Sequence, residues 1–183
     1  ALRTLVASRF VCACLATENS SSTTREAARA IAETIGAEYF DGVVQEALQH
    51  TTHNVEQMLG QTLSWENPAH DIPLQNIQAR VRGVVIWTLA NLRSALLLVT
   101  SNKSEAAVGY CTMDGDSSGG LAPIADVPKS LVGLWLAWAR EFHGLDCLDK
   151  VLVQQATAEL RPLAEGQTDE ADLMPFAILD QLM

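Results

Sequence analysis

Residues 100–120 gather side chains that bind cations and phosphates, directly after the apolar run ALLLV. Glu105 and Asp116 offer carboxylate oxygens, which are the ligands that Mg²⁺ prefers. Thr100 supplies a hydroxyl just before a predicted helix, whose amino end favours phosphate, and Lys129 begins a later predicted helix. These residue types predict the outline of a nucleotide site. As types alone, they fit a set of solvated loops with helix-capping residues equally well.

Short apolar runs alternate with helical patterns, and these elements must position the candidate residues. The apolar runs predict strands at residues 9–17, 38–44 and 95–100. Helical spacing predicts four longer helices, at residues 23–35, 43–59, 74–92 and 130–142, and short ones near the end. Thr23 and Glu26 form a predicted capping box for the first helix. The alternation predicts an α/β fold with a doubly wound, Rossmann-like parallel sheet and ligand loops at the carboxyl ends of its strands.

The composition excludes several classes of protein. With 12 basic and 22 acidic residues, the chain has a net charge of −10 and lacks the basic surface that nucleic-acid binding needs. We expect no membrane partner, because no apolar run reaches the roughly 18 residues of a membrane span. No secretory signal opens the chain, and the four cysteines show no disulfide framework, so we expect a cytoplasmic protein.

The order of these residues is more specific than their types. Four blocks closely resemble successive parts of the synthetase domain of NAD⁺ synthetases, a family of the N-type ATP pyrophosphatase group. They are CLATENSSSTTREAARAIAETIGA, LQNIQARVRGVVIWTLAN, TSNKSEAAVGYCTMDGDSSGGLAPIADVPKSLV and ATAELRPLAEGQTDEADLMPFAILDQL. The last block looks more like the long, glutamine-dependent form than the short, ammonia-dependent form. The resemblance implies a sheet of the adenine nucleotide alpha hydrolase-like type.

The resemblance also implies a ligase reaction with ATP as co-substrate and Mg²⁺ as cofactor. ATP adenylates the nicotinate carboxylate of deamido-NAD⁺ (nicotinic acid adenine dinucleotide) and releases pyrophosphate, and ammonia then converts the acyl-adenylate to the amide. In the glutamine-dependent form, an attached glutaminase domain supplies the ammonia. The family implies a homodimer or larger homo-oligomer.

Five residues match family positions around ATP. The resemblance implies that Thr100 and Thr157 contact ATP, that Lys129 lies on its phosphates, and that Glu105 binds Mg²⁺ or lies against the dinucleotide. Asp116 matches the aspartate of the family's Gly-Asp loop. Thr157 can also be read as a simple helix cap.

Asn76 and Arg80 fall in the block NIQAR, which the resemblance places against deamido-NAD⁺. Arg80 borders the apolar stripe of its predicted helix, so a surface ion pair is the alternative interpretation for this residue.

The chain departs from the family pattern in two respects that matter for function. The phosphate loop Ser-Gly-Gly-x-Asp-Ser is absent, and the chain ends before the basic tail that contacts the substrate in relatives. We therefore expect residues 1–183 to form a single domain, truncated at both ends and incomplete at its N-terminal strand. Two hypotheses remain: the chain is part of a longer NAD⁺ synthetase, or it is a catalytically inactive homologue that serves as a dimerisation or nucleotide-binding module.

Overall fold

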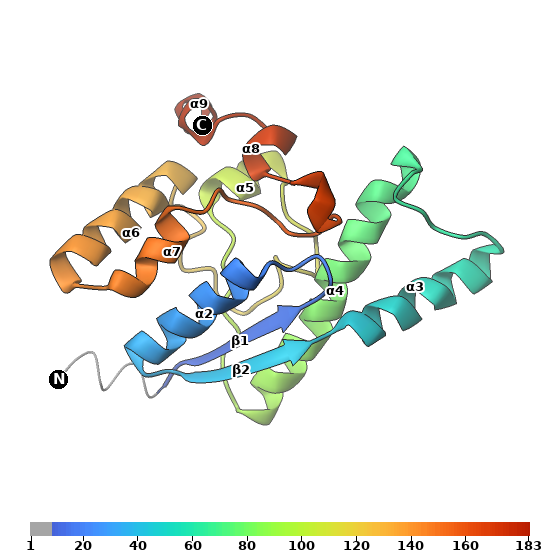
Figure 1. Ribbon diagram of the computed structural model, residues 1–183, viewed down its shortest axis with the longest axis horizontal. Helices are drawn as coiled ribbons and strands as arrows, with labels where there is room; N and C mark the ends of the chain where they lie inside the picture. Colours follow the sequence, from blue (N-terminus) through green and yellow to red (C-terminus); the bar gives the residue numbers. More distant parts are fainter. Residues whose placement is uncertain (1–8) are drawn as a thin grey trace. The chain divides into compact units, whose positions relative to one another are not determined.

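The computed structural model describes residues 9–183, which form two compact units (Figure 1). Among the described residues, the first unit contains residues 9–43 and Ser130–Ile178, and the second contains Val44–Lys129 and Leu179–Met183. The strand that we expected to be incomplete would precede Val11, and residues 1–8 lie outside the described part of the chain.

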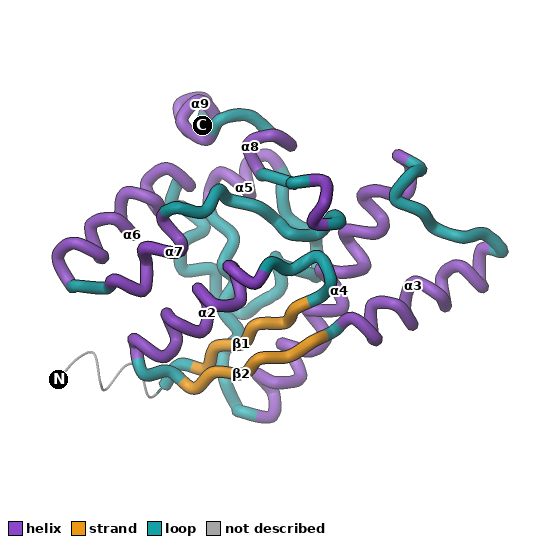
Figure 2. Tube along the Cα trace, in the orientation of Figure 1, coloured by secondary structure: helices purple, strands orange, loops and turns teal. Residues whose placement is uncertain are grey.

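The first unit is built on a parallel β-α-β arrangement. Strand β1 (Val11–Ala16) pairs with β2 (Glu38–Val43), from Val11 opposite Glu38 to Ala16 opposite Val43. Helix α2 (Ser22–Ile35) connects the two strands and packs on both (Figure 2). Parallel strands need such a crossover, because a tight turn can join only antiparallel neighbours. The predicted α/β fold with a parallel sheet is therefore confirmed, and the sheet has two strands among the described residues.

Helix α2 begins differently from the sequence prediction. Its N-cap is Ser21, whose side chain accepts a hydrogen bond from the Thr24 amide at 3.1 Å. The predicted capping box of Thr23 and Glu26 does not form, since the Glu26 carboxylate pairs instead with Lys150 at 2.7 Å. The helix ends as predicted at Gly36, whose φ of 75° lies in the left-handed region that glycine adopts readily.

The remaining regular elements of the first unit are helices, joined by irregular segments. Helix α6 (Lys129–His143) begins at the last residue of the second unit, as the sequence predicted to within one residue. Apolar side chains along α6 are exposed: Leu131, Leu134, Trp135, Trp138 and Phe142. The shorter elements that follow are η1 (Asp146–Leu148), α7 (Asp149–Leu152), η2 (Leu163–Glu165), α8 (Asp169–Asp172) and α9 (Phe176–Leu182). Helix α9 crosses the boundary, since the second unit resumes at Leu179. None of the described helices is both long and apolar enough to pass through a membrane.

The second unit contains α3 (Gln45–Leu59), α4 (Pro68–Leu92) and α5 (Lys103–Val108). Helix α4 begins six residues before the predicted start at Leu74, because the Asn67 side chain caps it by accepting the Ala69 amide at 3.0 Å. Proline is well tolerated in the first turn of a helix, and Pro68 occupies that place. Buried residues of α4 include Leu74, Ala79 and Val81, which anchor the helix in its unit.

The third predicted strand, at residues 95–100, does not form. This segment makes an isolated parallel bridge, between Leu98 and Leu121, with two backbone hydrogen bonds. The Val99 amide donates to the Leu121 carbonyl at 2.8 Å, and the Gly120 amide donates to the Leu97 carbonyl at 2.9 Å. A strand needs a neighbouring ladder, and the neighbouring segment here is a short glycine-containing turn. The extended segment still delivers Thr100 to the start of α5.

Candidate nucleotide site

Glu105 and Lys129 lie together in the second unit. Lys129 Nζ donates to Glu105 Oε1 at 2.9 Å, and the two side chains are 28% and 16% exposed. The other oxygen, Glu105 Oε2, accepts the Asn102 amide at 3.2 Å and the Ser101 hydroxyl at 3.2 Å. Asn102 in turn caps α5 by accepting the Glu105 amide at 3.1 Å, which completes a capping box. The carboxylate is therefore fixed by its own helix and presented to the ammonium group of Lys129.

Ser104 holds the main chain of the same lysine. Its side chain is fully buried, and its hydroxyl oxygen accepts the Lys129 amide at 2.8 Å. The same hydroxyl donates to Asp180 Oδ1 in α9. The sequence did not single out Ser104 or Asp180, because 76 residues separate them and no spacing rule connects them.

A loop at residues 112–118 is attached to helix α4 by two of the predicted residues. The Thr112 hydroxyl donates to Asn76 Oδ1 at 2.8 Å, and Arg80 Nε donates to the Met113 carbonyl at 3.1 Å. Asp116 closes the loop by accepting the Thr112 amide at 2.7 Å. Asn76, Arg80 and Asp116 therefore form one group, and the surface ion pair considered for Arg80 is replaced by a bond to a backbone carbonyl.

Two glycines allow this loop to approach α4 closely. A Cβ on Gly83 would lie 3.0 Å from the Asp114 carbonyl oxygen, and a Cβ on Gly115 would lie 2.9 Å from that of Ala79. The backbones of the loop and the helix are therefore in close contact on one face of α4. This face carries Asn76, Ala79, Arg80 and Gly83 at helical spacing.

A hollow of about 570 Å³ lies beside this contact. Its walls come from the second half of α4, from the loop and from the residue after the loop: Gly83, Val84, Trp87, Thr88, Asn91, Asp114, Ser117, Ser118 and Gly119. The hollow is open and most of its side chains are polar, with Val84 and Trp87 as the apolar ones. The sequence analysis missed Trp87 in this role, although it stands two turns after Arg80 on the same helix.

The Cys111 thiol connects the loop to Glu105 electrostatically. Burial raises the pKa of Cys111, and the charges of Asp116 and Glu105 raise it further. The Tyr110 amide, two residues before the loop 112–118, also donates to the Glu105 carbonyl at 2.9 Å, so the pair Glu105–Lys129 and this loop belong to one region of the second unit.

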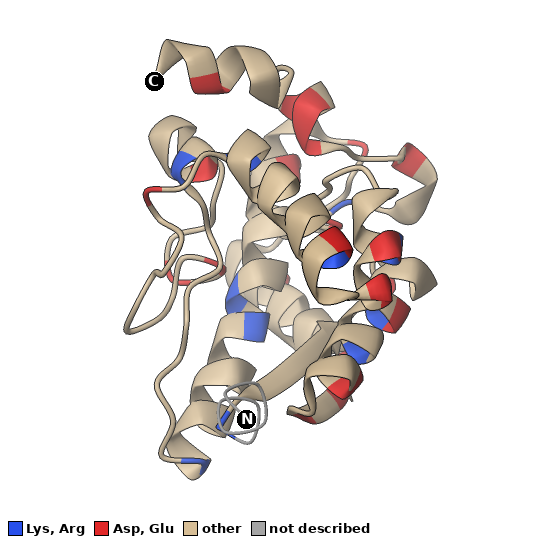
Figure 3. Ribbon diagram, turned by 90° about the vertical axis from the view of Figure 1, so that its left-hand side faces the viewer, with Lys and Arg blue, Asp and Glu red and all other residues tan. Residues whose placement is uncertain are grey.

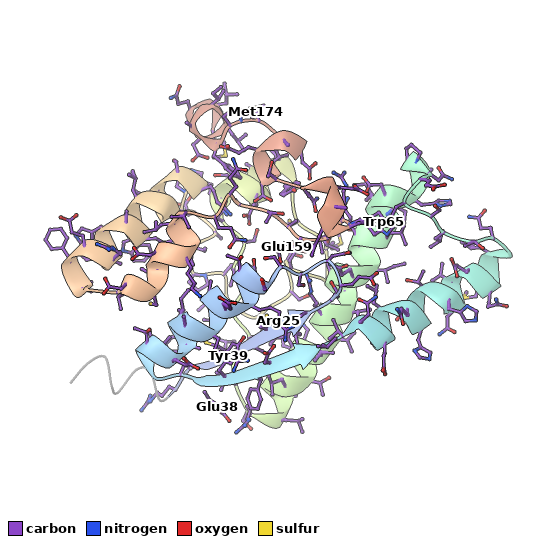
Figure 4. All side chains as sticks on the ribbon, viewed as in Figure 1. Arg25, Glu38, Tyr39, Trp65, Glu159 and Met174 are labelled. Atoms are coloured by element: carbon purple, nitrogen blue, oxygen red, sulfur yellow. The ribbon has the colours of Figure 1, made fainter. Side chains whose placement is uncertain are left out.

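Thr157 lies in the first unit, where its hydroxyl accepts the Glu159 amide at 3.2 Å and closes a turn. Glu159 is nearly buried and reaches the amino end of α2 (Figure 4). Its carboxylate accepts the Ser21 amide at 3.2 Å and the Thr24 hydroxyl at 2.8 Å. Thr157 thus caps a turn, not a helix, and its neighbour Glu159 ties that turn to the loop after β1.

Two predicted roles, the ATP contact of Thr100 and the binding of Mg²⁺ by Glu105, receive little support from surrounding residues. Thr100 is exposed, at the end of the extended segment before α5. Across residues 9–183, no group of three or more His, Cys, Asp or Glu side chains is placed to hold a metal ion. Any cation bound at Glu105 would therefore take most of its ligands from another molecule.

Comparison with known proteins identifies the family. Residues 1–183 match the family model described as NAD synthase. The chain belongs to this family. Over 164 residues it is 37% identical to a glutamine-dependent NAD(+) synthetase of Aquifex aeolicus, which covers 90% of this chain and 27% of that protein. The resemblance seen in the sequence is thereby confirmed.

Solved structures of NAD⁺ synthetases share the fold. A glutamine-dependent NAD(+) synthetase from Cytophaga hutchinsonii superposes with a TM-score of 0.73 at 43% identity, over 76% of this chain and 24% of that one. The enzyme from Acinetobacter baumannii, solved in complex with ADP, superposes with a TM-score of 0.70 at 22% identity, over 93% of this chain and 34% of that one. This NAD synthase chain spans about a quarter of the length of the curated relatives that it matches.

Proposed function

We propose that this chain is the synthetase part of a glutamine-dependent NAD⁺ synthetase. The observation that carries the proposal is its membership of the NAD synthase family along all 183 residues. The chemistry is adenylation of the deamido-NAD⁺ carboxylate by ATP, with release of pyrophosphate. Ammonia derived from glutamine then attacks the acyl-adenylate, and AMP leaves as the amide forms. A free carboxylate is a poor acceptor, whereas the mixed anhydride has a good leaving group.

The ammonium group of Lys129 has the principal role toward ATP. Its partner Glu105 is largely buried and is held by Ser101 and Asn102, just before α5, so the charge is positioned before the nucleotide arrives. A fixed cation stabilises the negative charge that develops on phosphate oxygens during transfer. We assign Lys129 to the ATP phosphates, with Thr100 of the same unit as a further ATP contact; for Thr157, in the first unit, the ATP contact rests on the family resemblance alone.

Mg²⁺ fits this arrangement with Glu105 as its protein ligand. Protein sites for Mg²⁺ commonly supply one or two carboxylates, while phosphates and water complete the shell. The residues around Glu105 offer one carboxylate with spare lone pairs beside the place assigned to the phosphates. When bound with ATP, Mg²⁺ would neutralise charge on the phosphate oxygens.

The hollow between α4 and the loop 112–118 is our candidate for the dinucleotide. Trp87 offers a face on which an aromatic ring can stack, and Asn91, Ser117 and Ser118 offer polar contacts. Asn76, Arg80 and Asp116 maintain the loop that forms one wall. We infer that these three residues act on deamido-NAD⁺ by shaping this wall as well as by direct contact.

The deciding experiment is NAD⁺ formation by the purified chain with ATP, Mg²⁺ and deamido-NAD⁺, supplied with ammonia and, separately, with glutamine. Product with ammonia would mean that other residues of this chain replace the absent phosphate loop, and in that case we expect Lys129→Ala to lower the rate by about 100-fold, as for loss of one preorganised electrostatic donor. Lys150→Ala is the matched control, because Lys150 is exposed and pairs with Glu26 in the first unit.

Binding of ATP, measured by calorimetry, tests the nucleotide site apart from catalysis. A folded chain that binds ATP and makes no NAD⁺ would be either the inactive nucleotide-binding homologue or a part that needs the phosphate loop of a longer synthetase. A folded chain that neither binds ATP nor forms NAD⁺ would overturn the proposal.

We further propose that the protein works in the cytoplasm as a homodimer. All four cysteines are free, which suits a reducing compartment, and α4 exposes Val84 and Leu92, which a second copy can cover. Sedimentation of the purified chain at the mass of a monomer would contradict the homodimer.

A further inference from the structure

The buried hydroxyl of Ser104 connects Lys129 to the final helix. Ser104 has no exposed surface. Its oxygen accepts the Lys129 amide at 2.8 Å and its hydrogen goes to Asp180 Oδ1. Since Leu179–Met183 belong to the second unit, all three residues lie within one compact part of the molecule.

The direction of these bonds is fixed by chemistry. A serine hydroxyl has one hydrogen to donate and two lone pairs to accept with. A carboxylate only accepts, so Asp180 takes the hydrogen and turns a lone pair of Ser104 toward the Lys129 amide. Hydrogen bonds to an ionised carboxylate are also stronger than neutral ones, so the hydroxyl has one preferred orientation.

From this arrangement we propose that Asp180 is a positioning residue, which holds Lys129 in place through Ser104. The inference rests on the role proposed above for Lys129 toward ATP. Ser104 binds the main chain of Lys129, while the adjacent Glu105 binds its ammonium group at 2.9 Å. Two consecutive residues of α5 therefore hold both ends of the lysine, and Asp180 fixes one of those attachments without touching the nucleotide.

The test compares Asp180→Ala with Ser104→Ala, the double variant and the conservative variant Asp180→Asn. The matched control is Asp126→Ala, because Asp126 is 98% exposed in the same unit and pairs only distantly with Lys103, at 3.5 Å. Each variant is characterised by hydrogen exchange of the Lys129 amide and by the dissociation constant of ATP. Near-ultraviolet circular dichroism and the melting temperature check the fold.

We expect Asp180→Ala to speed exchange of the Lys129 amide and to weaken ATP binding, each by about fivefold, the factor for one ordinary hydrogen bond. Ser104→Ala should do the same, and the double variant should be no worse than either, because all three break one chain of contacts. Asp180→Asn keeps an acceptor oxygen and should stay within about twofold of the wild type. Asp126→Ala should change neither quantity.

The two readouts separate failure of this inference from failure of the proposed function. Unchanged exchange at Lys129 in a folded Asp180→Ala variant would overturn the positioning role, whatever the chain does with ATP. Faster exchange with unchanged ATP binding would show that Asp180 holds Lys129 while Lys129 does not serve ATP, which contradicts the function assigned to it. Additive effects in the double variant would also overturn the inference.

Discussion

Gly83 and Gly115 set how closely the loop 112–118 approaches α4. The contact leaves no room for a methyl group, since a Cβ on Gly115 would lie 2.9 Å from the Cβ of Ala79 and 3.1 Å from its carbonyl carbon. The wall of the hollow therefore depends on the absence of two side chains as much as on the presence of Asn76 and Arg80.

We predict that Gly115→Ala destabilises the protein by about 1–3 kcal/mol, the usual cost of an overpacked contact. Gly133→Ala is the matched control, because nothing lies within 4 Å of its added Cβ and the residue is inside helix α6. That variant should be more stable than the wild type by about 0.5–1 kcal/mol, since alanine favours a helix. Urea unfolding of both variants measures the difference, and equal stability would contradict the close approach.

At the scale of residues, the sequence predicted which residues belong to the candidate site better than it predicted which of them contact one another. Glu105 and Lys129 were both predicted, and the structure places them 2.9 Å apart. Ser104 was not predicted, because a buried serine has the same local sequence signal as an exposed one. Asp180 was also missed, since its partner is 76 residues away and only the fold brings the two together.

At the scale of elements, the beginning of α2 shows how the structure chooses between neighbouring caps. Ser21 and Thr23 are both good N-cap residues, and the sequence prediction favoured Thr23 because Glu26 follows at capping-box spacing. In the structure Ser21 caps the helix and its amide is bound by Glu159, a residue 138 positions later in the chain. The tertiary contact thus decides the boundary.

We predict that Ser21→Ala costs about 1 kcal/mol of stability, the typical loss for an N-cap. Thr23→Ala should change stability by less than about 0.5 kcal/mol, because Thr23 is an exposed residue of the first turn. Thermal unfolding of the two variants compares them directly. A larger loss for Thr23→Ala would place the cap where the sequence had predicted it.

Strands were predictable only where both partners are near in sequence. The strands at residues 11–16 and 38–43 are consecutive along the chain, and the helix between them is long enough for the parallel crossover. The segment 95–100 has the same apolar character, yet it finds only a single bridge, to Leu121. Apolar content predicts burial, whereas a strand also needs a neighbour that composition does not reveal.

At the scale of the whole molecule, acidic side chains outnumber basic ones (Figure 3). Exposed ion pairs are concentrated in the first unit. In this unit, basic side chains hold the pKa of three carboxyl groups below their usual values. The pKa of Asp41 is lowered by Arg25 and, to a smaller degree, by Arg29. Lys150 lowers the pKa of Glu26, and Arg140 lowers that of Asp149. That the two units together form a single domain stays a prediction.

We predict that, as the pH falls, backbone amides of the first unit lose protection from hydrogen exchange before those of the second unit. A carboxyl group with a lowered pKa in the folded state stabilises the protein above its unfolded pKa, and this contribution disappears as the pH falls through its folded pKa. The effect should appear below about pH 4, the ordinary range of carboxyl groups. It should be modest and weakened by salt, since the groups are exposed. Hydrogen exchange at pH 7 and at pH 3.5 measures the loss of protection in each unit. An equal loss in both units would contradict the prediction.

The exposed tryptophans of α6 have an optical consequence. Trp135 and Trp138 meet water on a helix that begins at Lys129, and Trp87 lies half-exposed at the wall of the hollow. Indole emission shifts to shorter wavelength and resists acrylamide quenching when a ring leaves water. The unmodified protein therefore carries its own fluorescent reporters, and single substitutions at Trp87 or Trp135 assign each signal to a surface without an attached dye.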